Sequence, residues 1–125
     1  MSKFIYMNVS PDGERKNDCV TRAISLASGL PYAEVRRKLR HTASLLDCES
    51  SLCPTCYGFL IQEVLGGVPK DCYGMTVGEF ADKHSKGIYL IRISGHLTCL
   101  IDAILYDLWN CLDKPCSLAW KMPEN

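Results

Sequence analysis

Residues 87–109 read GIYLIRISGHLTCLIDAILYDLW, three dense runs of β-forming residues separated by two short breaks. The runs cover residues 88–93, 96–101 and 104–109. Isoleucine, leucine and tyrosine runs of this length, bounded by glycine, serine or aspartate, are typical of strands joined by tight turns. The stretch therefore predicts three consecutive antiparallel strands.

The break at residues 102–103 fits a two-residue hairpin turn, which fixes how the last two runs pair. In that register Thr98 faces Asp107. Because side chains alternate between the faces of a strand, His96 shares the face of Thr98 and Asp107, whereas Asn110 falls on the other. Asp107 is thus expected within reach of one His96 ring nitrogen. Asn110 is the alternative partner, since a shift of one residue would exchange the two.

Helical signals dominate the chain before this stretch. Asn17 or Asp18 can cap a first helix, and Gly29 suits its C-terminal end. Thr76 and Glu79 form a capping box for a short fourth helix. Helices followed by an antiparallel sheet define an α+β fold. The expected helices are 19–28, 31–42, 57–65 and the short one after Thr76. Two further strands are expected at 3–9 and 117–121, and a cysteine-rich loop is expected at 44–57.

Size and composition indicate one globular domain over residues 1–125. The chain is 47% hydrophobic and 22% charged, and its 14 basic residues balance its 14 acidic ones. This balance argues against a nucleic-acid partner or a charged membrane surface as partner. No stretch resembles a signal peptide or approaches the 18 apolar residues of a membrane span. We therefore expect a cytoplasmic protein whose cysteines are reduced, catalytic or bound to metal.

Cys19 stands where a helix is expected to begin, with His96 and Asp107 following in that order along the chain. A helix N-terminus stabilises a thiolate, and a neighbouring imidazole can take the proton of the thiol. A third group then holds the imidazole in its useful tautomer. Backbone N–H groups at the helix start, including that of Cys19, are suited to bind a developing oxyanion. The order predicts a Cys19–His96–Asp107 triad.

The segments that carry this order resemble the papain-like cysteine peptidases, in the small form found in bacteriophage and bacterial genomes. Bacteriocin leader peptidases and NlpC-type cell-wall hydrolases are relatives in the broader group. The resemblance implies a papain-like arrangement, with N-terminal helices packed on the C-terminal sheet. The resembling segments are NDCVTRAI at 17–24, GIYLI at 87–91, GHLT at 95–98 and YDLW at 106–109.

The resemblance also implies that Cys19 is the nucleophile, His96 the base and Asp107 the group that orients it. The bond cleaved would be a peptide, isopeptide or related amide or thioester bond in a peptide or protein substrate. Leader peptidases carry an oxyanion-hole glutamine six residues before the cysteine, where this chain has Gly13. Asn17 and Gln62 are the candidates to replace it.

A second set of cysteines, Cys48, Cys53, Cys56 and Cys72, offers an alternative chemistry. A Cys-x-x-Cys pair with two further thiols is suited to tetrahedral zinc, which would stabilise a loop with little core of its own. No other cofactor is expected. Cys99 alternates to the face opposite His96 and is expected in the core.

Three functions follow from these patterns. The first is a cysteine hydrolase, phage-encoded and acting in the host cytoplasm. The second is a non-catalytic papain-like interaction protein, for example a phage inhibitor of a host defence component. The third is a zinc-knuckle binding module.

Overall fold

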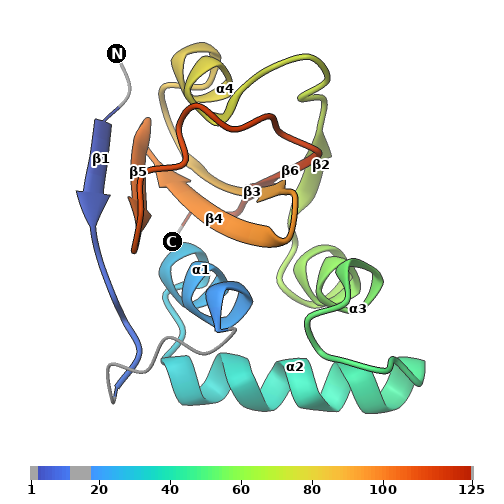
Figure 1. The fold of residues 1–125 in the computed structure, drawn as a ribbon. Helices are drawn as coiled ribbons and strands as arrows, with labels where there is room; N and C mark the ends of the chain where they lie inside the picture. Colours follow the sequence, from blue (N-terminus) through green and yellow to red (C-terminus); the bar gives the residue numbers. More distant parts are fainter. Residues whose placement is uncertain (1–2, 12–17, 125) are drawn as a thin grey trace.

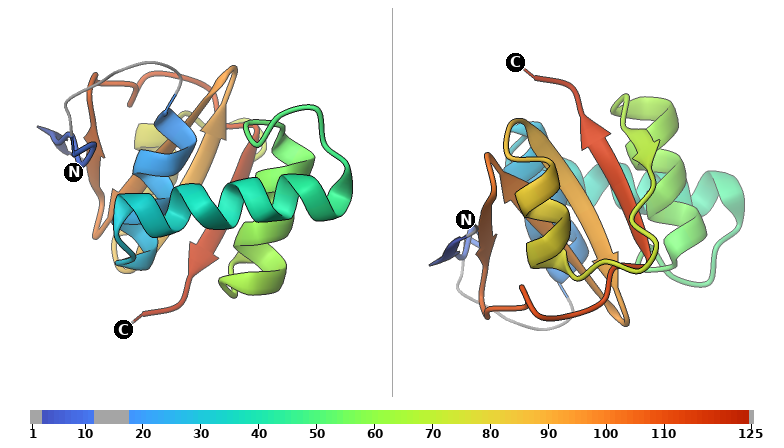
Figure 2. Two further views of the ribbon diagram at one scale, coloured as in Figure 1. Left: turned by 90° about the horizontal axis from the view of Figure 1, so that it is seen from below. Right: turned by 90° about the horizontal axis from the view of Figure 1, so that it is seen from above.

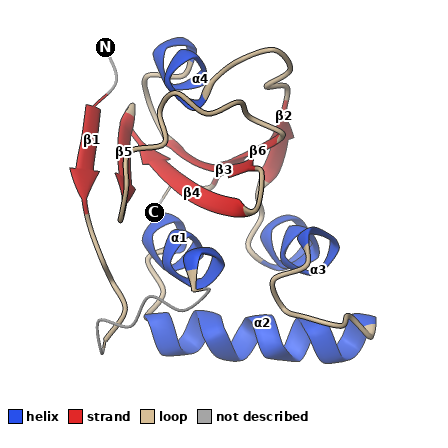
Figure 3. Cartoon of the chain, viewed as in Figure 1, coloured by secondary structure: helices blue, strands red, loops and turns tan. Residues whose placement is uncertain are grey.

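The computed structural model of the chain describes residues 3–11 and 18–124, and its elements are labelled in Figure 1. The fold is α+β, as expected, with helices and strands distributed as in Figure 3. The strands are β1 (Lys3–Tyr6), β2 (Val68–Lys70), β3 (Ile88–Ile93), β4 (His96–Ile101), β5 (Ile104–Asp107) and β6 (Leu118–Met122). The helices are α1 (Cys19–Ser28), α2 (Tyr32–Leu46), α3 (Pro54–Phe59), its π-helical continuation η1 (Leu60–Val64) and α4 (Val77–Lys83).

The described strands form one six-stranded sheet in the order β1-β5-β4-β3-β6-β2. The five strands from β5 to β2 are antiparallel to their neighbours, whereas β1 pairs parallel to β5. The C-terminal strands thus pair antiparallel as predicted, whereas the sheet as a whole is mixed because the N-terminal β1 joins it parallel. The N-terminal strand adds to the outer edge of β5, and the short β2 between the helices adds to β6, so the sheet draws on the whole chain.

The hairpin between β4 and β5 has the predicted register, with Cys99 opposite Tyr106 and Ile101 opposite Ile104. Asp102 and Ala103 form the turn with positive φ of 50° and 68°, as a type I′ turn requires. The Asp102 side chain accepts a hydrogen bond of 2.8 Å from the Gly87 backbone N–H. This contact fastens the turn to the start of β3 and holds the register that brings Asp107 beside Thr98.

Helices lie on both faces of the sheet (Figure 1). On one face α1 buries Val20 and Ile24 against Leu97 and Cys99 of β4, so Cys99 is a core residue as predicted. On the other face Phe80 of α4 is buried in the second core cluster. Figure 2 shows α2 lying across α1 and α3 on their outer side. The site-bearing α1 is therefore held between the sheet and α2.

Several element boundaries differ from those expected. The second helix, α2, continues to Leu46 and ends at Asp47, which adopts a left-handed φ of 54°. The third begins at Pro54, because proline is favoured in the first turn of a helix. A cysteine-rich loop over residues 44–57 is therefore wrong: the connection is much shorter. β5 ends at Asp107, two residues before the predicted end, and this early end frees the Asp107 side chain to turn toward α1.

Candidate active site

Cys19 is the first residue of α1, where the sequence predicted a helix start. Asp18 occupies the N-cap position but makes no side-chain capping hydrogen bond. Its carboxylate instead accepts hydrogen bonds from Arg22, at 2.6 Å, and from the Tyr32 hydroxyl, at 3.1 Å. The capping role expected for Asp18 is wrong, because these two partners draw its carboxylate away from the helix backbone. The Asp18 carboxylate therefore forms an ion pair with Arg22.

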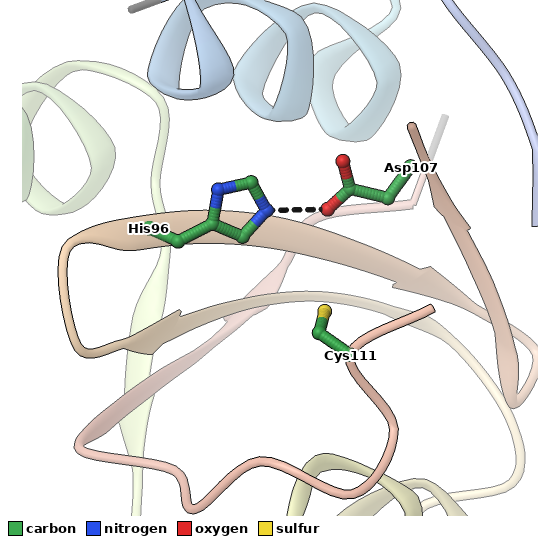
Figure 4. Close-up of side chains that lie close together, drawn as sticks. All are labelled: His96, Asp107 and Cys111. Atoms are coloured by element: carbon green, nitrogen blue, oxygen red, sulfur yellow. Dashed lines mark hydrogen bonds and ion pairs between the residues drawn. The ribbon is translucent and has the colours of Figure 1, made fainter. Parts of the chain in front are cut away.

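His96 begins β4 and meets the end of β5. Its Nε2 lies 2.6 Å from Oδ2 of Asp107, as Figure 4 shows, and the Thr98 hydroxyl donates to the same oxygen at 2.6 Å. The preceding turn contains Gly95, whose φ of 68° suits glycine. His96 and Asp107 are therefore brought together as predicted.

Asp107 is held as an anion despite being only 3% exposed. Its Oδ1 accepts hydrogen bonds from the Leu108 backbone N–H, at 2.6 Å, and from Arg22, at 3.3 Å. Burial raises the pKa of Asp107, but the hydrogen bonds from His96, Thr98 and Leu108 and the charge of His96 lower it below its usual value. An ionised Asp107 fixes the tautomer of His96 with a proton on Nε2.

Cys19 and His96 shift each other's pKa in opposite directions. Burial raises the pKa of Cys19, but hydrogen bonding to His96 and the Leu97 backbone, with the charges of His96 and Arg22, brings it below its usual value. Burial lowers the pKa of His96, yet its hydrogen bonds with Asp107 and Cys19 raise it to about 9. With Nε2 taken by Asp107, Nδ1 is the ring nitrogen directed toward α1 (Figure 4). Both shifts act in the direction that moves the proton from Cys19 to His96, so each favours the thiolate–imidazolium pair over the neutral pair.

Arg22 is the member of this site that the sequence did not reveal. It lies one turn after Asp18 on α1, is 6% exposed, and joins the carboxylates of Asp18 and Asp107. Its pKa is raised by these two carboxylates in spite of its burial, which alone would lower it. The i, i+4 spacing of Asp18 and Arg22 beside an apolar helix face was the available signal. Arg22 supplies the positive charge that lets two buried carboxylates coexist.

Cys111 lies on the opposite side of the His96–Asp107 pair from α1 (Figure 4). Its sulfur and the polar atoms of His96 and Asp107 lie within 4.8 Å of one another, the one such three-residue group among the described residues. Burial, with the negative charge of Asp107, raises the pKa of Cys111 to about 12. In this structure Nε2 and Oδ2 are hydrogen-bonded to each other, and Cys111 hydrogen-bonds to Thr98.

A pocket of about 240 Å³ opens beside Cys19. Its polar side chains besides the thiol and His96 are Tyr57 of α3 and Arg92 of β3, which interact with each other. Burial raises the pKa of Tyr57, so its hydroxyl remains a hydrogen-bond donor. The pocket is lined by Cys19, Val20, Leu52, Pro54, Tyr57, Arg92, Gly95 and His96.

The other site residues predicted from sequence lie elsewhere. Gln62 is wrong as an oxyanion donor, because its Oε1 accepts a hydrogen bond of 2.9 Å from the Trp120 indole and it lines a different pocket. Asn110 is wrong as the partner of His96, because its Oδ1 accepts a hydrogen bond from the Leu112 backbone at 3.0 Å. Asn17, the remaining oxyanion candidate, lies outside the described residues.

The predicted zinc quartet is not assembled. Cys56 hydrogen-bonds to Cys48 and interacts electrostatically with Cys53. Cys72 instead hydrogen-bonds to Cys116 in the second core cluster. All eight cysteines are free thiols. A site that uses Cys72 with the other three is therefore wrong, because the chain between them forms α3, η1 and β2.

Within residues 3–11 and 18–124, no helix has the length and apolar character needed to cross a membrane. Comparison with family models, curated proteins and solved structures finds no match to this chain.

Proposed function

We propose that this protein is a cysteine hydrolase that cleaves a peptide, isopeptide or related amide or thioester bond with Cys19, His96 and Asp107. The observation that carries the proposal is the geometry of three side chains: Cys19, at the start of α1, hydrogen-bonds to His96, whose Nε2 lies 2.6 Å from Oδ2 of Asp107. In keeping with this geometry, the pKa of the Cys19 thiol is lowered while that of His96 is raised to about 9. Perturbed values of this kind, in a pocket, mark functional sites. The proposal includes the papain-like arrangement, in which the nucleophile heads a helix that packs on the strand carrying the base.

The chemistry uses the thiolate and imidazolium directly. The Cys19 sulfur attacks the carbonyl carbon, and the C=O electron pair moves onto oxygen. When that pair returns, the bond to the leaving amine breaks and His96 donates its proton to the nitrogen. Water then attacks the acyl-enzyme, losing a proton to His96, and the Cys19 thiolate departs. Asp107 holds the ring in one orientation throughout.

The oxyanion needs donors that the predicted glutamine does not supply. We assign this role to the Cys19 backbone N–H at the start of α1 and to the Tyr57 hydroxyl. The hydroxyl lines the same pocket as the thiol and stays protonated because its pKa is raised. Preorganised donors of this type are worth a large part of the rate enhancement in acyl transfer.

Alkylation of the native protein with iodoacetamide at pH 6, followed by mass spectrometry of each cysteine peptide, tests the proposal. Cys19 is expected to react roughly tenfold to a hundredfold faster than the other thiols, because His96 and Arg22 lower its pKa and so increase the ionised fraction of its thiol. Half-buried Cys53, whose pKa is lowered by backbone hydrogen bonds rather than by a histidine, is the internal reference, and buried Cys111 is the matched control beside the same histidine.

A rate for Cys19 equal to that of an ordinary thiol would overturn the hydrolase. The alternative, a papain-like interaction protein without activity, would then stand. It is favoured by the pocket itself, which has no asparagine or glutamine among its described lining residues.

A further inference from the structure

A second pocket adjoins the candidate active site on the His96 side. Its volume is about 400 Å³, and Arg92 lines both it and the pocket beside Cys19. Trp109, in its wall, places its ring 5.2 Å from the His96 ring. The other lining residues are Ile93, Ser94, Lys114, Pro115, Cys116 and Ser117. The two pockets thus share a wall at Arg92, and none of the lining residues of the second comes from α1.

The charge of this second pocket is entirely positive. Arg92 and Lys114 are its ionisable cations, and neither forms an ion pair with any carboxylate in the described part of the chain. Acidic charges act on cysteines in and beside the pocket: Glu79 on Cys116, and Asp107 with Asp113 on Cys111. Glu79 is itself engaged by the Thr76 backbone N–H. Two cations without a carboxylate partner leave the pocket open to an anionic group.

Arg92 is held in place before any ligand arrives. Its Nη1 donates to the Ser117 hydroxyl at 3.0 Å, and that hydroxyl donates to the Arg92 carbonyl at 3.0 Å. The Ser117 backbone N–H also donates to the Arg92 carbonyl, at 2.8 Å. Arg92 is half-buried and is held by Ser117, just before β6, and by Tyr57. Its guanidinium has five N–H donors, so donors remain for a ligand, and its planar fork matches a carboxylate.

We propose that this pocket binds a carboxylate in the part of the substrate that leaves with the amine. The inference rests on the proposed hydrolase. His96 protonates the leaving nitrogen, so the departing fragment lies on the side of His96, where this pocket opens. Trp109, 42% exposed, offers an apolar surface for the stem of that fragment, and Arg92 with Lys114 offers charge for its carboxylate. The carboxylate is either an acidic side chain or a free C-terminus.

Binding is measured with three dipeptide probes on the Cys19→Ala variant, which performs no chemistry. Gly-Glu-amide carries a side-chain carboxylate, Gly-Gln-amide is its neutral isostere, and Gly-Gln has a free C-terminal carboxylate. The reporter is the indole N–H resonance of Trp109 in ¹⁵N-labelled protein. Trp120, the other tryptophan, is hydrogen-bonded to Gln62 beside a different pocket and is the reference.

At least one carboxylate probe is expected to bind roughly tenfold or more tightly than Gly-Gln-amide, since a charged hydrogen-bonded pair contributes on that scale. Whichever carboxylate probe binds tighter identifies the source of the group. Lys114→Met should cut the preference severalfold, and Arg92→Met should cut it to less than about twofold. Lys86→Met, an exposed lysine outside the pocket, is the matched control and should leave it unchanged.

Equal dissociation constants for the three probes would overturn the inference, as would a preference that survives both Arg92→Met and Lys114→Met. Lys114 is exposed and makes no side-chain contact on which the fold depends, so its variant tests the pocket even if Arg92→Met unfolds. Failure of the proposed hydrolase function is detected separately, because slow alkylation of Cys19 would overturn that function whether or not the pocket prefers carboxylates.

Discussion

Two thiols flank the same histidine–aspartate pair, and their acidities are opposite. Cys19, at the start of α1, has a lowered pKa, whereas the pKa of Cys111, on the far side of the pair, is raised to about 12. Both are removed from water to a large extent, and burial raises the pKa of each. The difference lies in which part of the pair each sulfur meets.

Cys19 hydrogen-bonds to His96 and receives the positive charges of His96 and Arg22. Cys111 instead receives the negative charges of Asp107 and Asp113, and its hydrogen bond to Thr98 does not offset them. Proximity to a histidine and an aspartate is therefore not enough to activate a cysteine. The thiol must lie on the imidazole side, away from the carboxylate, and a cation must balance the buried anions.

The first way to break this contrast is to remove the cation. Arg22→Met leaves the carboxylates of Asp18 and Asp107 without their shared positive charge in a buried site. Breaking a buried pair from one side costs about 3–5 kcal/mol. We expect the free energy of unfolding, measured with urea, to fall by that amount.

Arg37→Met is the matched control, because Arg37 is exposed on α2 and forms its ion pair with Glu34 of that helix. Its effect should stay below about 1 kcal/mol. Similar losses in the two variants would show that Arg22 is not an essential counter-charge.

The second way is to make Cys19 resemble Cys111 by removing the imidazole. In His96→Gln the hydrogen bond and charge that lower the Cys19 pKa are lost, and burial remains. Alkylation of Cys19 by iodoacetamide at pH 6 should slow roughly tenfold to a hundredfold. Well above pH 9 the rate should approach that of the wild type, because Cys19 is then ionised in both proteins.

The rate of hydrolysis by the wild type should also depend on pH through the protonation of His96. Because the His96 pKa is raised to about 9, the ring keeps its proton through neutral pH and loses it as pH rises through that value. Hydrolysis of an amide substrate, whose leaving nitrogen needs that proton, should therefore decline above about pH 9. A His96→Gln profile superimposable on that of the wild type would contradict the ion pair.

The third and smallest effect concerns the oxyanion rather than the thiol. Tyr57→Phe removes a hydroxyl from the pocket beside Cys19 and leaves the hydrogen bonds of His96 in place. Acylation by p-nitrophenyl acetate should slow roughly tenfold, because its transition state develops an oxyanion. Alkylation by iodoacetamide forms no oxyanion and should change less than about twofold, and equal slowing of the two reactions would remove Tyr57 from this role.

Local sequence signals predicted much of the scaffold. The helix start at Cys19, the Thr76–Glu79 capping box and the hairpin turn at Asp102 all depend on residues within a few positions of one another. The hairpin register in turn placed Asp107 rather than Asn110 beside His96. These features were predictable because short-range geometry alone fixes them.

The predictions that were wrong or missing depend instead on contacts between residues far apart in the sequence. Gln62 was a candidate because of its residue type, yet the π-helical turn η1 directs it to Trp120. Cys72 was grouped with Cys48 by spacing, yet it packs against Cys116 from the other end of the chain. The parallel pairing of β1 with β5 joins strands about a hundred residues apart, which no local pattern specifies.

The sequence by itself determined the α+β class, the helix that begins at Cys19 and the pairing of His96 with Asp107, because propensity, capping and turn geometry act over a few residues. Only the tertiary structure decided that Arg22 joins two buried carboxylates and that a second thiol, Cys111, lies on the other side of the His96–Asp107 pair with its pKa shifted the opposite way. The physical reason is that charge–charge interactions and burial depend on distances in space. Those distances are set by how α1 packs on β4, not by the order of residues along the chain.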